Sequence, residues 1–125
     1  MARRFVTVVL GLVYILQLPA EIRLSGVFGD NMVIQRDTSV KIWGWGDKGE
    51  SVAVHFNGQH RKTKVMKNGR WEVELEKMSF GGPYEMTVAG RKNTIRIGNI
   101  LIGDIWFCSG QSNMEFQVKE AYNAA

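Results

Sequence analysis

Residues 51–58 read Ser-Val-Ala-Val-His-Phe-Asn-Gly, and this short stretch decides the fold of most of the chain. Two valines and a phenylalanine occupy every second position, which is the pattern of a strand with one buried face. Asn57-Gly58 then supplies the positive φ angles of a tight hairpin turn. The stretch therefore predicts an antiparallel hairpin whose second arm begins near His60.

The same pattern repeats on both sides of this hairpin. A second Asn-Gly pair separates residues 60–66 from residues 70–76, where a tryptophan, a valine and a leucine alternate with three glutamates. Glycine-rich turns separate the further strands that we expect at 40–45, 84–88 and 94–97. Six or more short strands at intervals of about ten residues predict a mainly β fold, an antiparallel two-sheet sandwich over residues 21–99. About eighty residues can bury a modest core.

Near residue 100 the pattern changes. Residues 100–108 read Ile-Leu-Ile-Gly-Asp-Ile-Trp-Phe-Cys, apolar at nearly every position, which favours a strand buried on both faces of a parallel sheet. A helix would follow over residues 114–125. Residues 100–125 are therefore expected to hold the first strand, turn and helix of a truncated α/β domain. We also expect removal of these residues to improve solubility, because such a strand would be unpaired.

The first twenty residues are interpreted as a signal peptide. Arg3 and Arg4 precede an apolar stretch too short to span a bilayer comfortably. Residues 18–20, Leu-Pro-Ala, then end in a small residue at the expected cleavage site. The protein is therefore expected to be exported to the periplasm or the extracellular space, without a stable membrane anchor. An uncleaved anchor is the rival interpretation, because Leu18 is larger than the residue usually found at that position. Cys108 is the one cysteine and has no internal partner; we expect it to be a small buried hydrophobe.

Charge argues against nucleic acid as a partner. Without Arg3 and Arg4, 14 basic residues remain against 12 acidic ones. The basic residues are scattered among the acidic ones and form no stripe.

Ser112 is the candidate catalytic residue. It lies in Gly-Gln-Ser-Asn-Met, residues 110–114, straight after the apolar run. A serine where a strand opens into a helix can attack an ester carbonyl while neighbouring backbone N–H groups hold the oxyanion. Ser112 and Glu115 also form a capping box, and from spacing alone the two explanations fit equally well. Because residue 114 is methionine, the turn is not a Gly-x-Ser-x-Gly elbow.

Residues 103–115, Gly-Asp-Ile-Trp-Phe-Cys-Ser-Gly-Gln-Ser-Asn-Met-Glu, resemble the nucleophile block of the sialate O-acetylesterase family, carbohydrate esterases of the SGNH-hydrolase type. Residues 28–36, 43–45, 69–71 and 81–84 resemble the β-sandwich segment that precedes the catalytic domain in this family. The resemblance covers nearly everything after the leader. It implies that the chain is the N-terminal portion of such an enzyme.

At the site, the resemblance makes Ser112 the nucleophile and the source of one oxyanion N–H. Gln111 and Asn113 flank it and are expected to contact substrate, an acetylated sugar or sialoglycan. No metal or cofactor is implied. The family's catalytic histidine and acid lie far downstream, and no histidine follows Ser112 in this sequence. Since a serine hydroxyl without a base is a poor nucleophile, the chain alone is expected to be inactive.

Other residues receive structural interpretations. His55 and His60 are expected to be exposed residues beside the hairpin, not a displaced base. Asp104 is expected to be a strand-end carboxylate bonded to backbone. The alternative hypothesis for the whole chain is a non-catalytic exported module that binds a sugar or a protein. Its stacking platform would be the indoles at positions 43, 45 and 71, although tryptophans in such a pattern are more often core.

Overall fold

The computed structural model describes residues 21–110, and the expected signal peptide and C-terminal helix lie outside this range. All regular structure in the described part is β-strand. No helix within residues 21–110 is long and apolar enough to cross a membrane. The strands are β1 (Arg23–Leu24), β2 (Val33–Gln35), β3 (Val40–Trp45), β4 (Ser51–Phe56), β5 (Gln59–Lys64), β6 (Arg70–Leu75), β7 (Gly81–Ala89) and β8 (Thr94–Gly103).

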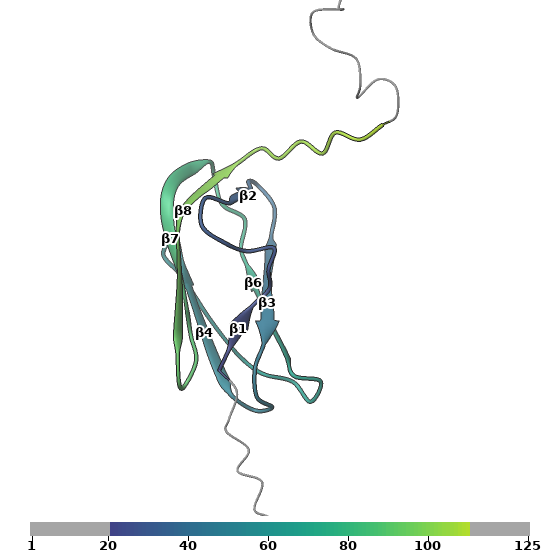
Figure 1. Cartoon of the computed structure of the whole chain (residues 1–125). Coiled ribbons are helices and arrows are strands. Elements are labelled where there is room, and N and C mark those ends of the chain that lie inside the picture. Colours follow the sequence, from purple (N-terminus) through teal and green to yellow (C-terminus); the bar gives the residue numbers. More distant parts are fainter. Residues whose placement is uncertain (1–20, 111–125) are drawn as a thin grey trace, which may run out of the picture.

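The strands form two sheets. One sheet has the order β1-β3-β6 and the other β2-β8-β7-β4-β5. Figure 1 shows them facing each other, with β4, β7 and β8 in one layer and β1, β3 and β6 in the other. All paired strands are antiparallel except β2 and β8, which run parallel. The predicted two-sheet sandwich is confirmed, with this one parallel pair as a difference.

Strand alternation places the core between the sheets. On β4, Val52, Val54 and Phe56 are buried, and β5 follows through Asn57-Gly58 with φ angles of 44° and 74°. The predicted hairpin is therefore confirmed. Sixteen buried apolar residues fill the space between the sheets: Ile22, Ile34, Ile42, Val52, Val54, Phe56, Val65, Trp71, Val73, Leu75, Met78, Met86, Val88, Ile97, Ile100 and Ile102.

The second Asn-Gly turn carries the chain from one sheet to the other. It leads from β5 to β6, which belong to different sheets. Side chains hold these two strands together: Gln59 Nε2 donates to the Glu76 carbonyl at 3.2 Å and its Oε1 accepts from Glu76 N at 2.8 Å. Arg61 Nε donates to the Glu74 carbonyl at 3.2 Å. The sandwich is thus closed along its β5–β6 side.

The strand predicted over residues 100–108 is wrong in both its start and its burial. Residues 100–103 are the last part of β8, so the predicted division between residues 99 and 100 falls inside one strand of the sandwich. Ile100 and Ile102 are buried in the core, whereas Leu101 between them is 45% exposed. The strand is therefore buried on one face only, paired with β7 on one side and β2 on the other.

A bulge explains why β8 looked like two segments. Met86 pairs with Ile97 and Tyr84 with Ile100, so the single residue Glu85 of β7 lies opposite two residues of β8, Gly98 and Asn99. Asn99 has a φ of 54°, and this local conformation is that of a β-bulge. Gly98-Asn99 therefore has the composition of a turn but bends a continuous strand.

Candidate active-site segment at the end of β8

The predicted site residues Gln111, Ser112 and Asn113 lie outside the described residues. The structure does describe the segment that leads to them. Figure 1 shows the chain leaving the sandwich at the end of β8, beside β2. Residues 104–110 extend from this end without regular structure.

Backbone and side-chain hydrogen bonds fix the point at which the chain leaves the sheet. The end of β2 holds the end of β8: Arg36 N donates to the Gly103 carbonyl at 2.9 Å. Two residues further on, Ile105 N donates to Gln35 Oε1 at 2.8 Å. The direction of the segment leading to Ser112 is therefore set by residues at the end of β2.

An ion pair adds to this anchor. Arg36 Nε lies 2.8 Å from Asp104 Oδ1 and 3.7 Å from Asp37 Oδ2. The hydrogen bond from Arg36 holds the pKa of the Asp104 carboxyl below its ordinary value, and the same bond raises the pKa of Arg36. The predicted backbone partner of Asp104 is wrong, because the carboxylate binds a side chain 68 residues away in sequence.

Sequence reasoning missed the anchoring role of Gln35 and Arg36. Both residues lie in the 28–36 stretch that carries the family resemblance. The available signal was the polar pair Gln35-Arg36 directly after the apolar pair Val33-Ile34. Without the parallel pairing of β2 with β8, nothing in that stretch indicates its partner.

The residues after Asp104 are exposed. Ile105, Trp106 and Phe107 are 52%, 85% and 93% exposed. Cys108 is also exposed, so the prediction that it is a buried hydrophobe is wrong. These apolar residues come after β8, the last strand in the described part of the chain, so no later strand covers them there.

His55 and His60 lie away from this segment. They face each other across the β4–β5 hairpin, both exposed, with ring centroids 3.8 Å apart and nearly parallel planes. Desolvation, followed by the charges of His55 and Lys62, lowers the pKa of His60. Because β5 and β2 are opposite edges of their sheet, the structure does not bring this pair to the exit of β8. Their predicted exposure is confirmed.

The three tryptophans of the alternative hypothesis do not form one platform. Trp71 is fully buried in the core. Trp43 is covered by Phe28 in an edge-to-face contact at 4.7 Å, with the Arg70 guanidinium 5.6 Å from its ring. Of the three, Trp45 alone is exposed, at 41%. Stacking of a sugar on all three indoles is therefore ruled out in this fold.

Two surface hollows lie at opposite ends of the sandwich. A groove of about 370 Å³ is lined by residues of β2, β3 and the loops before them, Val27, Met32 and Val33 among them, and by Ile105 after β8. A wider hollow of about 890 Å³ surrounds residues 47–51 and contains side chains of both charge signs. Within residues 21–110, no three histidine, cysteine or acidic side chains are grouped to hold a metal ion.

The chain is similar in sequence to known esterases. Over 114 aligned residues the chain is 36% identical to the sialate O-acetylesterase of Mus musculus, covering 82% of this chain and 21% of that protein. The human sialate O-acetylesterase is 35% identical over 113 residues, with 82% and 22% covered. The resemblance to sialate O-acetylesterases is confirmed. The chain spans about a fifth of the length of these relatives.

A solved structure agrees with the sialate O-acetylesterase match. The crystal structure of a carbohydrate acetylesterase from Xanthomonas citri superposes with a TM-score of 0.73 at 33% identity, over 83% of this chain and 24% of that chain. No protein-family profile matches the chain. The fold of the described residues is therefore a segment that also occurs within a larger carbohydrate acetylesterase.

Proposed function

We propose that this chain supplies the β-sandwich and the nucleophile segment of an exported carbohydrate O-acetylesterase, with Ser112 as nucleophile. The observation that carries the proposal is the combined match of sequence and fold to acetylesterases over more than four fifths of the chain. The anchored end of β8 supports it, because it starts the path toward Ser112 from a fixed point. The substrate class is an O-acetylated sugar, sialic acid included.

The reaction is acyl transfer in two steps. Ser112 Oγ forms a bond to the acetyl carbonyl carbon as its proton passes to a base. The carbon–oxygen bond to the sugar breaks, and the sugar oxygen takes that proton. Water then gives a proton to the base and attacks the acetyl carbon. The bond from that carbon to Ser112 Oγ breaks, acetate leaves, and Oγ takes the proton back from the base. The backbone N–H of Ser112 donates to the oxyanion in both steps, and Gln111 and Asn113 line the acyl pocket.

The base has to come from outside this sequence. His55 and His60 lie on β4 and β5, on the side of the sheet away from β2 and β8, and no histidine follows Ser112. The family resemblance places the histidine and its acidic partner in the downstream catalytic domain. Ser112 is thus one member of a catalytic set that the whole enzyme completes.

Covalent trapping in a chimera tests the assignment of the nucleophile. Residues 21–125 replace the matching segment of the Xanthomonas citri acetylesterase, and a fluorophosphonate probe is added. We expect mass spectrometry to find one adduct, on Ser112. The adduct should disappear in Ser112→Ala and persist in Ser109→Ala, the matched control three residues earlier. A folded chimera whose Ser112 stays unmodified would contradict the proposal.

A further inference from the structure

We propose that His55 and His60 form a two-histidine chelate site for a divalent transition-metal ion, of the class of Zn²⁺, Ni²⁺ and Cu²⁺. The site lies on the outer face of the five-stranded sheet. The two residues are Cα partners in the antiparallel register of β4 and β5, and both are exposed, so that an ion reaches them from solvent. This inference goes beyond the proposed function, because the esterase mechanism uses neither histidine.

The hairpin turn brings the two imidazoles close together. Phe56 and Gln59 close the two-residue turn, so His55 and His60 are the next pair along. In such a hairpin this second pair is the non-hydrogen-bonded kind, in which side chains approach most closely. The ring centroids are 3.8 Å apart. Two nitrogen atoms that share a tetrahedral Zn²⁺, each at about 2.0–2.1 Å, lie about 3.4 Å from each other. The separation of the rings therefore matches that of two imidazole ligands of one ion.

The ring nitrogens of the pair are available to an ion. Within residues 21–110, neither imidazole makes a hydrogen bond or an ion pair, and each ring stacks on the other. A neutral imidazole presents one nitrogen with a free lone pair. Two such nitrogens on paired strands are a chelating set for the ions that prefer imidazole, namely Zn²⁺, Ni²⁺ and Cu²⁺.

The backbone fixes both histidines before an ion binds. His55 lies between Val54 and Phe56, whose side chains are buried in the core. Its strand β4 is paired on both sides, with β5 and with β7. Because the positions of the two ligands are fixed in this way, little conformational freedom is lost on chelation. Once one imidazole has bound the ion, the second meets it at a high effective concentration.

The surroundings of the pair define the number of protein ligands. Glu85 lines the same surface hollow of about 290 Å³ as the two histidines, but its carboxylate is paired with Arg96 at 3.3 Å. Lys62, two residues after His60 on the same face of β5, carries a positive charge and is no ligand. We therefore assign two protein ligands, with water completing the coordination shell. The hard ions Mg²⁺ and Ca²⁺ require oxygen ligands and are not expected to bind.

NMR of the ring ¹⁵N nuclei during a titration with Zn²⁺ tests the site directly. The chain contains two histidines in all, so both rings can be followed separately. The 125-residue chain carries Cys108→Ser and no affinity tag, because the exposed thiol is itself a metal ligand. We expect both rings to follow one binding curve with a stoichiometry of one ion per chain, and Mg²⁺ to have no effect. Separate curves for the two rings, or no response up to about 1 mM Zn²⁺, would overturn the proposal.

Matched variants distinguish chelation from binding by single histidines. In calorimetric titrations with Ni²⁺, again with Cys108→Ser, we expect His55→Asn and His60→Asn each to weaken binding at least roughly tenfold. The control His60→Asn/Lys64→His keeps two histidines on the same face, but it places them about 13 Å apart along the strands. It should bind Ni²⁺ as weakly as His60→Asn alone. All three substituted residues are exposed, so the variants keep the fold. Full affinity in the control variant, or in either single variant, would contradict a chelate formed by this pair.

Discussion

Arg36 and Asp104 show how a single side-chain contact anchors the chain at the point where it leaves β8. The two residues are half exposed, and their 2.8 Å contact joins the end of β2 to the first residue after β8. Exposed ion pairs contribute little to stability. We therefore assign this pair a positional role: it fixes the direction in which the chain leaves the sandwich.

The Asp104 carboxyl provides a pH test of this contact. Its pKa is lowered from 3.8, first by the hydrogen bond from Arg36, so the contact is present above pH 3.8 and is lost as pH falls through the depressed pKa of the folded protein. In Arg36→Gln we expect the midpoint of the Asp104 carboxyl, followed by ¹³C NMR, to rise toward 3.8. Arg96→Gln, which removes the partner of Glu85, is the control and should leave that midpoint unchanged. An identical midpoint in wild type and Arg36→Gln would contradict the ion pair.

Gly44 is a second residue whose role can be measured. A Cβ atom there would overlap the Arg23 carbonyl oxygen and lie 2.8 Å from Cζ2 of the buried Trp71. The backbone of β1 cannot yield without losing its pairing with β3, so Gly44→Ala should reduce the free energy of unfolding by about 3 kcal/mol. Urea titration measures this loss. Gly98→Ala, where a Cβ meets nothing within 4 Å, should change stability by less than about 0.5 kcal/mol. Equal effects of the two substitutions would show that Gly44 is not packed as described.

At the level of elements, strands with strict apolar alternation were predicted correctly from the sequence. The prediction of β8 was wrong, because its turn-like composition and its apolar run both disagree with the way the strand pairs. β4 and β6 follow directly from their apolar periodicity and the turns beside them. β8 does not, because Gly98-Asn99 has turn composition and residues 100–102 are all apolar. The bulge at Asn99 and the parallel partner β2 together convert this stretch into one strand with one buried face.

For the candidate site, single residues were predicted from the sequence, but the contact between distant residues was not. Asp104 was identified from its place at the end of an apolar run, but its partner was not, because hydrogen bonds across 68 residues leave no local pattern. The exposure of His55 and His60 followed from the hairpin alone. The assignment of Ser112 rests on the family resemblance and on its position after the apolar run, and Ser112 lies outside the described residues.

The revised β8 changes the expected effect of truncation. Ending the chain at Asn99 removes the buried side chains of Ile100 and Ile102 and leaves β2 without a partner. Loss of each buried isoleucine costs about 2–5 kcal/mol, so this shortened chain should be largely unfolded and less soluble. A chain ending at Gly110 keeps the whole of β8 and should unfold at the same urea concentration as the full chain.

Circular dichroism during urea titration separates the two truncated forms. Cooperative unfolding of the form that ends at Asn99, at the midpoint of the full chain, would contradict the integration of residues 100–103 into the sandwich. The earlier expectation, that removing residues 100–125 improves solubility, would then be restored.

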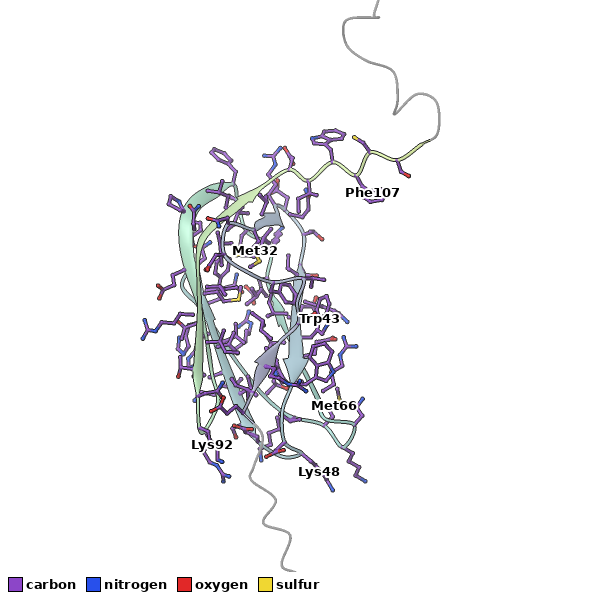
Figure 2. All side chains as sticks on the ribbon, viewed as in Figure 1. Met32, Trp43, Lys48, Met66, Lys92 and Phe107 are labelled. Carbon is purple, nitrogen blue, oxygen red and sulfur yellow. The ribbon has the colours of Figure 1, made fainter. Side chains whose placement is uncertain are left out.

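At the scale of the whole molecule, the sandwich holds the start of the segment that continues from β8 in a fixed position. Figure 2 shows Lys48 and Lys92 near one end of the sandwich; at the other end, Gln35, Arg36 and Asp104 hold the chain where it leaves β8. The match to about a fifth of each sialate O-acetylesterase is the expected coverage for one structural portion of such an enzyme. Under the proposed function, catalysis needs both this segment and the rest of such an enzyme, since no histidine follows Ser112 in this sequence.

Deacetylation of an O-acetylated sugar by the Xanthomonas chimera tests the central claim most directly. Acetate release is measured for the chimera, for its Ser112→Ala variant and for the isolated 125-residue chain. Our account predicts release by the chimera, a loss of about 10³-fold or more in Ser112→Ala, and no release by the isolated chain. Release by the chimera that is unaffected by Ser112→Ala, or a folded chimera without any release, would contradict the claim that this chain carries the nucleophile of a carbohydrate acetylesterase.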